Sequence, residues 1–276
     1  YKKDNSLSQT KTTYAATLYE GTFSVGLDKK FIRIDRDDPP NKGALKLSLN
    51  PVLIHTTDKN ILFDCGIGEF GEDTGPDTIR ENLEDHGLTE FDITDIFLSH
   101  LHYDHIGGLA HRENGYWELT FPEAKLWVSQ KGWEKVMGKD EWYDEEKTAF
   151  ISFIDAKADL HFLEEEDQPY PEMSVKKIGG HTEFHQVLLF DDGDKKYMQA
   201  GDVIGTKGAI NRTYAAKYDF EPKVSQQKRE ELSKLAFDEG YTILAYHEDR
   251  HPLFKLTDYN EKTGYSTENI DSYVPA

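Results

Sequence analysis

The stretch SHLHYDHIGG, residues 99–108, places three histidines and an aspartate within six positions. In an extended backbone alternate side chains point the same way, so His100 and His102 can bind one cation. Asp104 and His105 follow on the turn and can serve a second cation nearby. A helix that begins at Gly107 would keep this turn tight. We therefore interpret the stretch as part of a metal site.

The types of donor separate a catalytic metal site from a structural one. Structural zinc sites are closed by four ligands and are typically rich in cysteine. This chain has one cysteine, Cys65, and its clustered donors are histidine and aspartate. We therefore expect a catalytic metal site rather than a zinc ion that only stabilises the fold.

Three further candidate ligands each follow an apolar, strand-like run. They are His181 in IGGHTEFH, Asp202 in QAGDVIG and His247 in ILAYHED. Loops that leave strand ends are where a rigid scaffold displays functional groups. Five histidines and two aspartates suffice for two metal sites that share one carboxylate.

Apolar runs and turn residues predict the elements that carry these loops. The predicted strands are Thr17–Val25, Leu45–His55, Asn60–Cys65, Asp95–Ser99, Lys125–Ser129, Leu160–Leu163, Val175–Ile178, Val187–Asp191, Lys196–Gln199 and Thr242–Ala245. The predicted helices are Thr78–His86, Gly132–Ile154 with a break near Gly138, and Gln226–Glu239, and Leu27–Ala44 is predicted to be a long loop. This mixture predicts an α/β (α+β) fold in which helices cover sheets.

Length and charge bound the class of protein. The 276 residues are 37% hydrophobic, which suits one domain over residues 14–276 after a loose segment of residues 1–13. A net charge of −20 opposes a nucleic-acid partner. No apolar run approaches the roughly 18 residues of a membrane span. Since the chain begins with Tyr1, a cleaved export signal is an alternative to the cytoplasmic location that we favour.

The order HxHxDH, GGHT, GD and a late histidine resembles the metallo-β-lactamase superfamily. The resemblance implies a four-layer αββα sandwich with a metal site at one edge of its two sheets. It implies two metal ions, most simply zinc, with other divalent metals as alternatives. In that arrangement one ion is held by His100, His102 and His181, the other by Asp104, His105 and His247, and Asp202 bridges them together with a hydroxide.

Two residues resemble parts of the superfamily's motifs that do not bind metal. Asp64 in FDCGIG matches the DxG element, which implies a carboxylate that holds a ligating histidine by its free N–H. The alternative is an ordinary turn aspartate. His185 in GGHTEFH matches the last histidine of GHTxxH, which implies a side chain that lines the site. We interpret Cys65 as a packing residue.

Longer stretches resemble the quorum-quenching, YtnP-like lactonases of this superfamily. These are LKLSLNPVLIHTTDKNILFDCGIG, SHLHYDHIGGL, FPEAKLWVSQKGW, GGHTEFHQVLLF, AAKYDFEP and AYHEDRHPLF. The resemblance implies a hydrolase in which a metal-bridging hydroxide opens the lactone ring of N-acyl-homoserine lactones, with Asp104 as proton relay. The alternatives are a dinuclear zinc hydrolase of phosphodiesters or thioesters, and a metal-binding protein without turnover.

The substrate contacts follow the resemblance less closely. Some of these lactonases have a tyrosine three residues after the bridging aspartate, where this chain has Gly205, so Tyr218 or Tyr214 would have to supply the hydroxyl. Tyrosines that only pack are the alternative. For the acyl chain of a small-molecule lactone we expect a groove lined by Trp133, Met137, Trp142, Tyr143 and Phe150. Core packing or a homodimer contact is the alternative for this segment.

Overall fold

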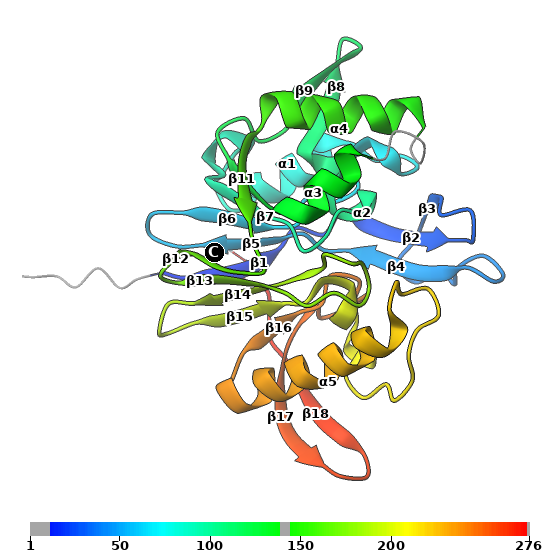
Figure 1. Cartoon of the computed structure of the whole chain (residues 1–276), viewed down its shortest axis with the longest axis vertical. Coiled ribbons are helices and arrows are strands. Elements are labelled where there is room, and N and C mark those ends of the chain that lie inside the picture. Colours follow the sequence, from blue (N-terminus) through cyan, green and yellow to red (C-terminus); the bar gives the residue numbers. More distant parts are fainter. Residues whose placement is uncertain (1–11, 139–143, 275–276) are drawn as a thin grey trace, which may run out of the picture.

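Two sheets pack face to face in the computed structural model, which describes residues 12–138 and 144–274 (Figure 1). The first sheet has the order β1 (Tyr14–Thr17), β5 (Val52–His55), β6 (Asn60–Phe63), β7 (Asp95–Phe97), β10 (Lys125–Ser129) and β11 (Asp159–Leu163). The second runs in chain order through β12 (Glu166–Tyr170), β13 (Met173–Lys177), β14 (Gln186–Asp191), β15 (Lys196–Gln199), β16 (Thr242–Leu244), β17 (Leu253–Asn260) and β18 (Gly264–Asn269).

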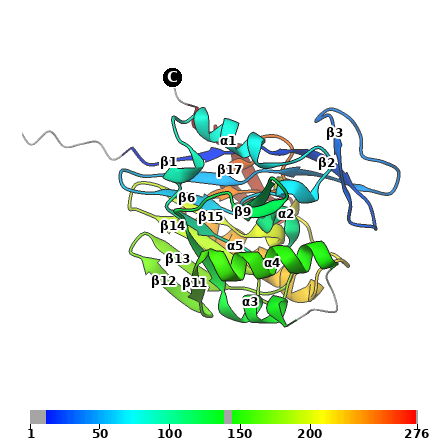
Figure 2. The ribbon, with the colours of Figure 1, turned by 90° about the horizontal axis from the view of Figure 1, so that it is seen from above.

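Helices cover the outer face of each sheet. The first sheet carries α1 (Pro76–Glu84), α3 (Gln130–Met137) and α4 (Glu145–Lys157), and Figure 2 shows this layer from above. The second sheet carries α5 (Pro222–Glu239) on its opposite face (Figure 1). This is the four-layer αββα sandwich that the resemblance implied. No helix within the described ranges is both long and apolar enough to cross a membrane.

Alternate side chains of a strand belong to different apolar cores of the sandwich. In β6, Ile61 and Phe63 belong to the apolar core between the two sheets, whereas Leu62 belongs to the core beneath α1, α3 and α4. In β14, Leu188 faces the middle of the sandwich, while Val187 faces α5. Because successive side chains of a strand point to opposite faces, strands that are apolar throughout can serve two cores at once.

Two small sheets complete the chain. One joins β3 (Phe31–Ile34), β2 (Gly21–Val25) and β4 (Leu45–Leu49), and it extends from the end of the first large sheet (Figures 1 and 2). The other is a hairpin of β8 (Ala110–Glu113) and β9 (Tyr116–Leu119).

Several predicted boundaries were wrong. The predicted loop Leu27–Ala44 contains β3, and the predicted strands Thr17–Val25 and Leu45–His55 each divide into two strands. The helix predicted from Gly107 is a short helix α2 (Tyr103–Ile106) followed by a 3-10 turn. In that turn a Cβ atom on Gly107 or Gly108 would lie within about 2 Å of the carbonyl oxygens of Ile67 or Cys65. The absence of a side chain at Gly107 and Gly108 therefore allows their loop to pack closely against the loop that contains Cys65 and Ile67.

The strand directions bring five loops to one edge of the sandwich. In the first sheet β6, β7 and β10 are parallel, and in the second β15 and β16 are parallel. Strand β13 has the same direction as β15, because each is antiparallel to β14. All the predicted metal-site residues follow the C-terminal ends of β6, β7, β13, β15 and β16, so they meet at this edge. Residues 1–11 of the predicted loose segment lie outside the described residues.

Candidate metal centre

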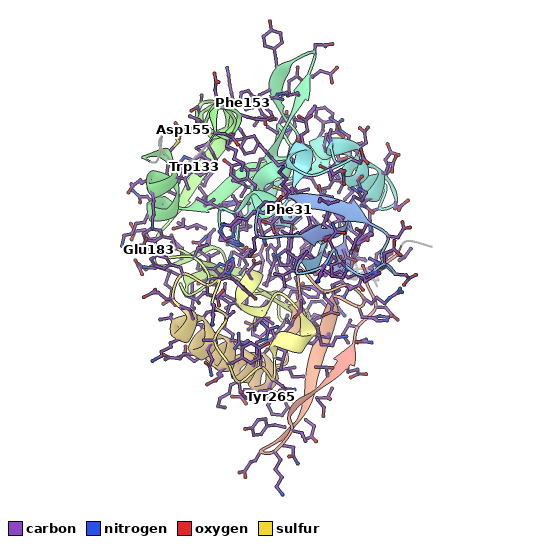
Figure 3. The ribbon with its side chains drawn as sticks, turned by 90° about the vertical axis from the view of Figure 1, so that its right-hand side faces the viewer. Phe31, Trp133, Phe153, Asp155, Glu183 and Tyr265 are labelled. Atoms are coloured by element: carbon purple, nitrogen blue, oxygen red, sulfur yellow. The ribbon has the colours of Figure 1, made fainter. Side chains whose placement is uncertain are left out.

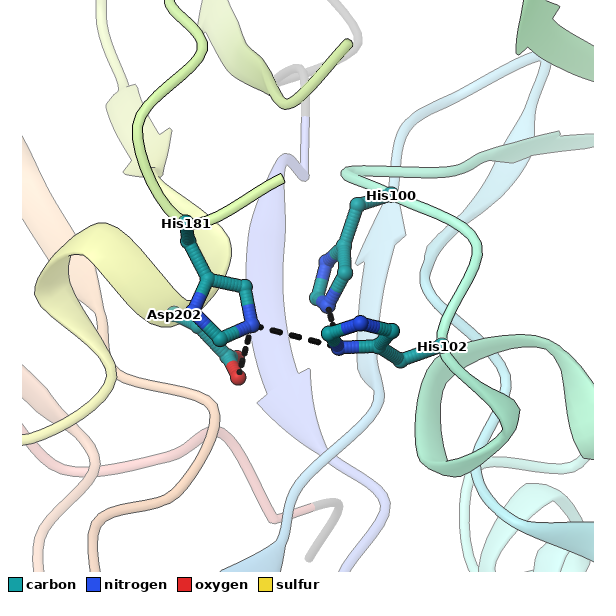
Figure 4. Close-up of side chains that lie close together, drawn as sticks. All are labelled: His100, His102, His181 and Asp202. Carbon is teal, nitrogen blue, oxygen red and sulfur yellow. Dashed lines mark hydrogen bonds and ion pairs between the residues drawn. The ribbon is translucent and has the colours of Figure 1, made fainter. Parts of the chain in front are cut away.

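The histidines that follow β7 and β13 converge on one point. Nε2 of His100 lies 3.0 Å from Nδ1 of His102, which lies 3.2 Å from Nε2 of His181. Nε2 of His181 in turn lies 3.0 Å from Oδ2 of Asp202. Figure 4 shows the three rings directed toward one another and toward the carboxylate. Ligand atoms about 2 Å from a shared tetrahedral ion are ~3.3 Å apart, so these four side chains can surround one cation.

A second group lies on the other side of Asp202. Its members are Asp104, His105 and His247, and their donor atoms lie within 4.8 Å of one another. Oδ1 of Asp202 is 3.1 Å from Nε2 of His105 and 3.0 Å from Nε2 of His247. The two oxygens of Asp202 therefore face different groups, which is the geometry of a bridging carboxylate. The structure thus brings all seven predicted ligands together.

Hydrogen bonds to the far nitrogens orient four of the rings. Nδ1 of His105 is 2.8 Å from Oδ2 of Asp64, and Nδ1 of His181 is 2.8 Å from Oδ1 of Asp219. Nδ1 of His247 is 3.1 Å from the carbonyl oxygen of Ser48, and Nδ1 of His100 is 3.1 Å from Oγ of Ser99. A carboxylate or carbonyl accepts the Nδ1 proton and leaves the Nε2 lone pair directed at the centre.

Unpaired buried atoms test whether a cation fits here. Nε2 of His105, Nε2 of His247 and Oδ1 of Asp202 are buried, and none has a hydrogen-bond partner among the described residues. When these rings are neutral, with their protons on Nδ1, both present lone pairs to a carboxylate oxygen about 3 Å away. Facing acceptors without a donor are costly in a buried site. A cation between them satisfies all three atoms, so the donor set fits a metal.

The charges of the metal-free cluster agree with this arrangement. Burial disfavours the charged form of His181, but the carboxylates of Asp202 and Asp219 outweigh it and raise the pKa of His181 to about 9. Burial acts in the same way on His247, where Asp202 again prevails and raises the pKa. Burial works against the carboxylate of Asp202, yet the neighbouring histidines hold its pKa well below the usual range. In the metal-free protein, protons on His181 and His247 thus supply the positive charge that metal cations would supply there.

Asp64 connects several parts of the centre. Its Oδ1 accepts a hydrogen bond from the backbone N–H of Ser99 at 2.8 Å. Its Oδ2 accepts from Oγ of Ser99 at 2.7 Å, from Nε2 of Gln199 at 2.6 Å and from His105. The side chain is fully buried and its backbone has φ 56°. Asp64 therefore joins the loops after β6, β7 and β15, and this contact with His105 is the one that the resemblance implies.

Glu20 was missed by the sequence analysis. Its buried carboxylate accepts hydrogen bonds from the backbone N–H groups of Ile67 at 2.8 Å and Gly68 at 3.1 Å. Burial raises the pKa of Glu20 to about 7, although these two bonds and Arg33 oppose the rise. Glu20 thus holds the loop that follows Asp64. Asp219, the partner of His181, lies in the matching stretch AAKYDFEP, but no role was predicted for it.

His185 and Gly205 support the ligands by packing. The His185 ring is fully buried, lies 4.6 Å from the ring of His100 and has its Nε2 2.9 Å from the carbonyl oxygen of Ala200. Burial lowers its pKa to about 3, so this ring stays neutral. A Cβ atom on Gly205 would lie 3.3 Å from Cδ2 of His247. A tyrosine at this position would press against a ligand ring.

The predicted acyl groove needs correction. Trp133 is 2% exposed and Phe150 is fully buried, and both belong to the core beneath the first sheet's helices. Nε1 of Trp133 donates to Oδ1 of Asp155 on α4 at 2.8 Å (Figure 3). Met137 packs partly buried against the same core. Helical spacing of aromatic residues here reflects packing between α3 and α4. The other two predicted groove residues, Trp142 and Tyr143, lie outside the described residues.

Tyr218 lies beside the centre. Its ring is 6.3 Å from the ring of His181, and its side chain is 63% exposed. Partial burial raises the pKa of its hydroxyl, although Arg212 opposes the rise. Tyr214 is 64% exposed in the same loop.

Comparisons with known proteins agree with the fold. The family model described as the metallo-beta-lactamase superfamily matches residues 46–247. A search of curated proteins gives no match. Among solved structures, a probable metal-dependent hydrolase from Staphylococcus aureus has 23% identity and a TM-score of 0.74, over 95% of this chain and 96% of that one.

Lactonases are also among the similar structures. AidC, described as a dizinc quorum-quenching lactonase in complex with a product, has 21% identity and a TM-score of 0.71, over 93% of this chain and 94% of its own. An N-acyl homoserine lactone hydrolase with N-hexanoyl-L-homoserine at its catalytic metal centre has 20% identity and a TM-score of 0.63, over 85% and 93%. At these identities the likeness shows a shared fold.

Proposed function

The chain belongs to the metallo-β-lactamase superfamily, as a metal-dependent hydrolase of that fold, and we propose that it opens the lactone ring of N-acyl-homoserine lactones with two bound zinc ions. The observation that carries the proposal is the position of Asp202. Its Oδ2 lies 3.0 Å from His181, and its Oδ1 lies 3.0 Å from His247 in the other group. One carboxylate shared by two donor groups suits a dinuclear hydrolytic centre.

Similar structures and the net charge favour a lactone as the substrate. Two solved structures of the same fold are described as lactonases of this kind. An uncharged lactone also suits a chain with a net charge of −20, because such a surface repels phosphodiesters of nucleic acids. Thioesters and small phosphodiesters are the competing substrates.

The reaction is addition of water across the ring ester bond. Hydroxide joins the carbonyl carbon, the bond from that carbon to the ring oxygen breaks, and the ring oxygen gains a proton. Zinc ions bound in the two groups would supply a water molecule that ionises near neutral pH and would polarise the attacked carbonyl.

The chain's own residues hold and move protons around this reaction. Oδ2 of Asp104 lies 3.6 Å from Nε2 of His105 and 3.5 Å from Nε2 of His247 in the second group. Asp104 relays the proton to the departing ring oxygen. The Tyr218 hydroxyl, whose pKa is ordinarily near 10 and is raised further by burial, keeps its proton at neutral pH and donates a hydrogen bond to the substrate.

A panel of substrates tests the proposal. Zinc-reconstituted protein is incubated with acyl-homoserine lactones, a phosphodiester and a thioester, and the products are identified by mass spectrometry. We expect the lactone to gain one water and become the acyl-homoserine acid. Asp202→Ala is the matched inactive variant. Cleavage of the phosphodiester or the thioester without ring opening of any lactone would reject the lactone as the substrate. The protein would still be a hydrolase.

A further inference from the structure

Three large aromatic side chains are exposed within one short loop. Tyr214 is 64% exposed, Tyr218 is 63% exposed and Phe220 is 57% exposed. We name residues 212–220, which connect the region after Asp202 to α5, the aromatic loop. Single exposed aromatic residues are ordinary, but several gathered beside a functional site mark a binding surface. The mechanism above uses only the hydroxyl of Tyr218.

The aromatic loop is attached to a candidate metal ligand. The backbone N–H of Phe220 donates to the carbonyl oxygen of His181 at 3.1 Å, and Oδ1 of Asp219 accepts from Nδ1 of the same residue at 2.8 Å. The next residue, Glu221, donates its backbone N–H to the carbonyl oxygen of Gly180 at 2.8 Å. The C-terminal end of the aromatic loop is therefore held against His181, and the Tyr218 ring lies 6.3 Å from the His181 ring.

A buried arginine fixes the other end of the loop. Arg229 of α5 is 2% exposed, and its Nη2 donates to the carbonyl oxygens of Arg212 at 3.1 Å and Tyr214 at 3.0 Å. Nε2 of Gln226 donates to the carbonyl oxygen of Thr213 at 3.0 Å. A loop whose backbone is held at both ends has less freedom to lose, which lowers the entropy cost of binding an apolar group.

A second element continues the apolar surface. Nζ of Lys135 on α3 lies 5.2 Å from the ring centre of Phe220 and 5.7 Å from that of Phe184. The lysine also forms an ion pair with Glu183, which leads from His181 to Phe184. Phe184, three residues after His181, and Phe220, whose N–H is bonded to the His181 carbonyl, thus lie near the same lysine. The amine of Lys135 is held in the ion pair with Glu183, and the methylene groups of its side chain are apolar.

We propose that Phe220, with Tyr218 and Phe184 beside it, is the surface that receives the apolar chain of the substrate and sets its preferred length. The identity of this substrate chain as the acyl chain of a lactone rests on the proposed function. The contact replaces the groove expected around Trp133 and Phe150, whose side chains are buried. Each methylene that leaves water there should strengthen binding by a factor of up to about four.

Direct binding separates this inference from the choice of substrate. The metal-loaded protein is titrated calorimetrically with butanoate and with decanoate below its micelle-forming concentration. Both ligands carry the same carboxylate, so the ratio of their dissociation constants reports the contact made by the chain. We expect wild-type protein to bind decanoate at least about tenfold more tightly, and Phe220→Ser to lose most of this preference.

Two variants serve as controls. Phe220→Leu keeps an apolar side chain and should retain the preference for decanoate. Phe91→Ser removes an equally exposed phenylalanine, at 61%, that precedes β7 and so lies at the end of that strand away from His100. It should leave both dissociation constants unchanged.

The outcomes decide the inference and the function separately. Equal binding of the two acids by wild-type protein, or a full preference for decanoate in Phe220→Ser, overturns the inference. A preference that depends on Phe220, in a protein that opens no lactone, supports the surface and rejects the proposed substrate. Ring opening whose dependence on chain length is the same in Phe220→Ser and wild type overturns the surface and retains the function.

Discussion

Oδ1 of Asp219 lies 2.8 Å from Nδ1 of His181, and this contact decides which nitrogen of the ring faces the cluster. The carboxylate is 8% exposed and belongs to the aromatic loop, whereas His181 follows β13. By accepting the Nδ1 proton, Asp219 leaves Nε2 directed at Oδ2 of Asp202, 3.0 Å away. One ion pair thus links the loop that borders the site to the ligand at its centre.

Asp219→Asn should weaken zinc affinity roughly 10–100-fold, the usual cost of removing a partner that orients a ligand. The asparagine has the same shape but a weaker acceptor for the Nδ1 proton. Competition with a chromophoric chelator measures the affinity. Asp238→Asn, on the exposed surface of α5, is the control and should bind zinc like wild type. Unchanged affinity in Asp219→Asn would show that the contact only packs the loop.

Asp64→Asn should lower both metal affinity and stability. Four donors from Ser99, His105 and Gln199 converge on the Asp64 carboxylate, and an asparagine would direct an amide N–H at some of them. A buried donor left without an acceptor costs about 1–3 kcal/mol. Urea unfolding of the metal-free protein measures this loss, and the chelator assay measures the affinity. A variant that loses neither would make Asp64 an ordinary turn residue.

Glu20 should make the stability of the metal-free protein depend on pH. Its pKa is about 7 in the folded chain, against 4.5 for an ordinary glutamate. Between these values the folded state holds more protons than the unfolded state, so the free energy of unfolding falls as pH rises from about 4.5 to about 7. Glu20→Gln should lack this part of the fall, whereas Glu81→Gln on the surface of α1 should keep it. Parallel pH profiles for Glu20→Gln and wild type would contradict the prediction.

Zinc binding should release protons at pH 7. The pKa of His181 is about 9 in the metal-free protein, because the carboxylates of Asp202 and Asp219 outweigh burial, so its ring is charged at pH 7. A ligating histidine must be neutral, and affinity should therefore increase with pH up to about 9. Calorimetry in buffers of different ionisation enthalpy counts the protons. We expect at least one per chain, and an enthalpy independent of buffer would exclude a charged His181.

Much of the fold was predictable because apolar runs in this chain mark strands that are buried on both faces. Lys125–Ser129 and Lys196–Gln199 were predicted with the bounds that the structure has, and the predicted strand Val187–Asp191 begins one residue after β14 does. Strand β18 was missed because its sequence GYSTEN is mostly exposed and polar, and only pairing with β17 makes it a strand. Strand β3 was missed because charges and the nearby Pro39-Pro40 favoured a loop.

The site was predictable where spacing along the chain carries the chemistry, and unpredictable where folding creates a contact. The spacing of histidine and aspartate from His100 to His105 indicates a metal site without any further information. Asp219 stands 38 residues from His181, and Glu20 stands 47 residues from Ile67, so no local pattern marks either contact. The burial of Trp133 and Phe150 follows from the packing of α3 against α4, which the spacing of aromatic residues does not specify.

The central claim is that Asp202 joins two cation sites, and the number of metal ions per chain tests it most directly. Purified protein is stripped with chelator, reconstituted with zinc, freed of loose metal and measured by elemental analysis. We predict two zinc ions per wild-type chain, two for the surface control Asp238→Ala, and a clear loss for Asp202→Ala, since the bridging carboxylate binds both ions and offsets their repulsion. One ion or fewer in reconstituted wild-type protein, or two in Asp202→Ala, would contradict the claim.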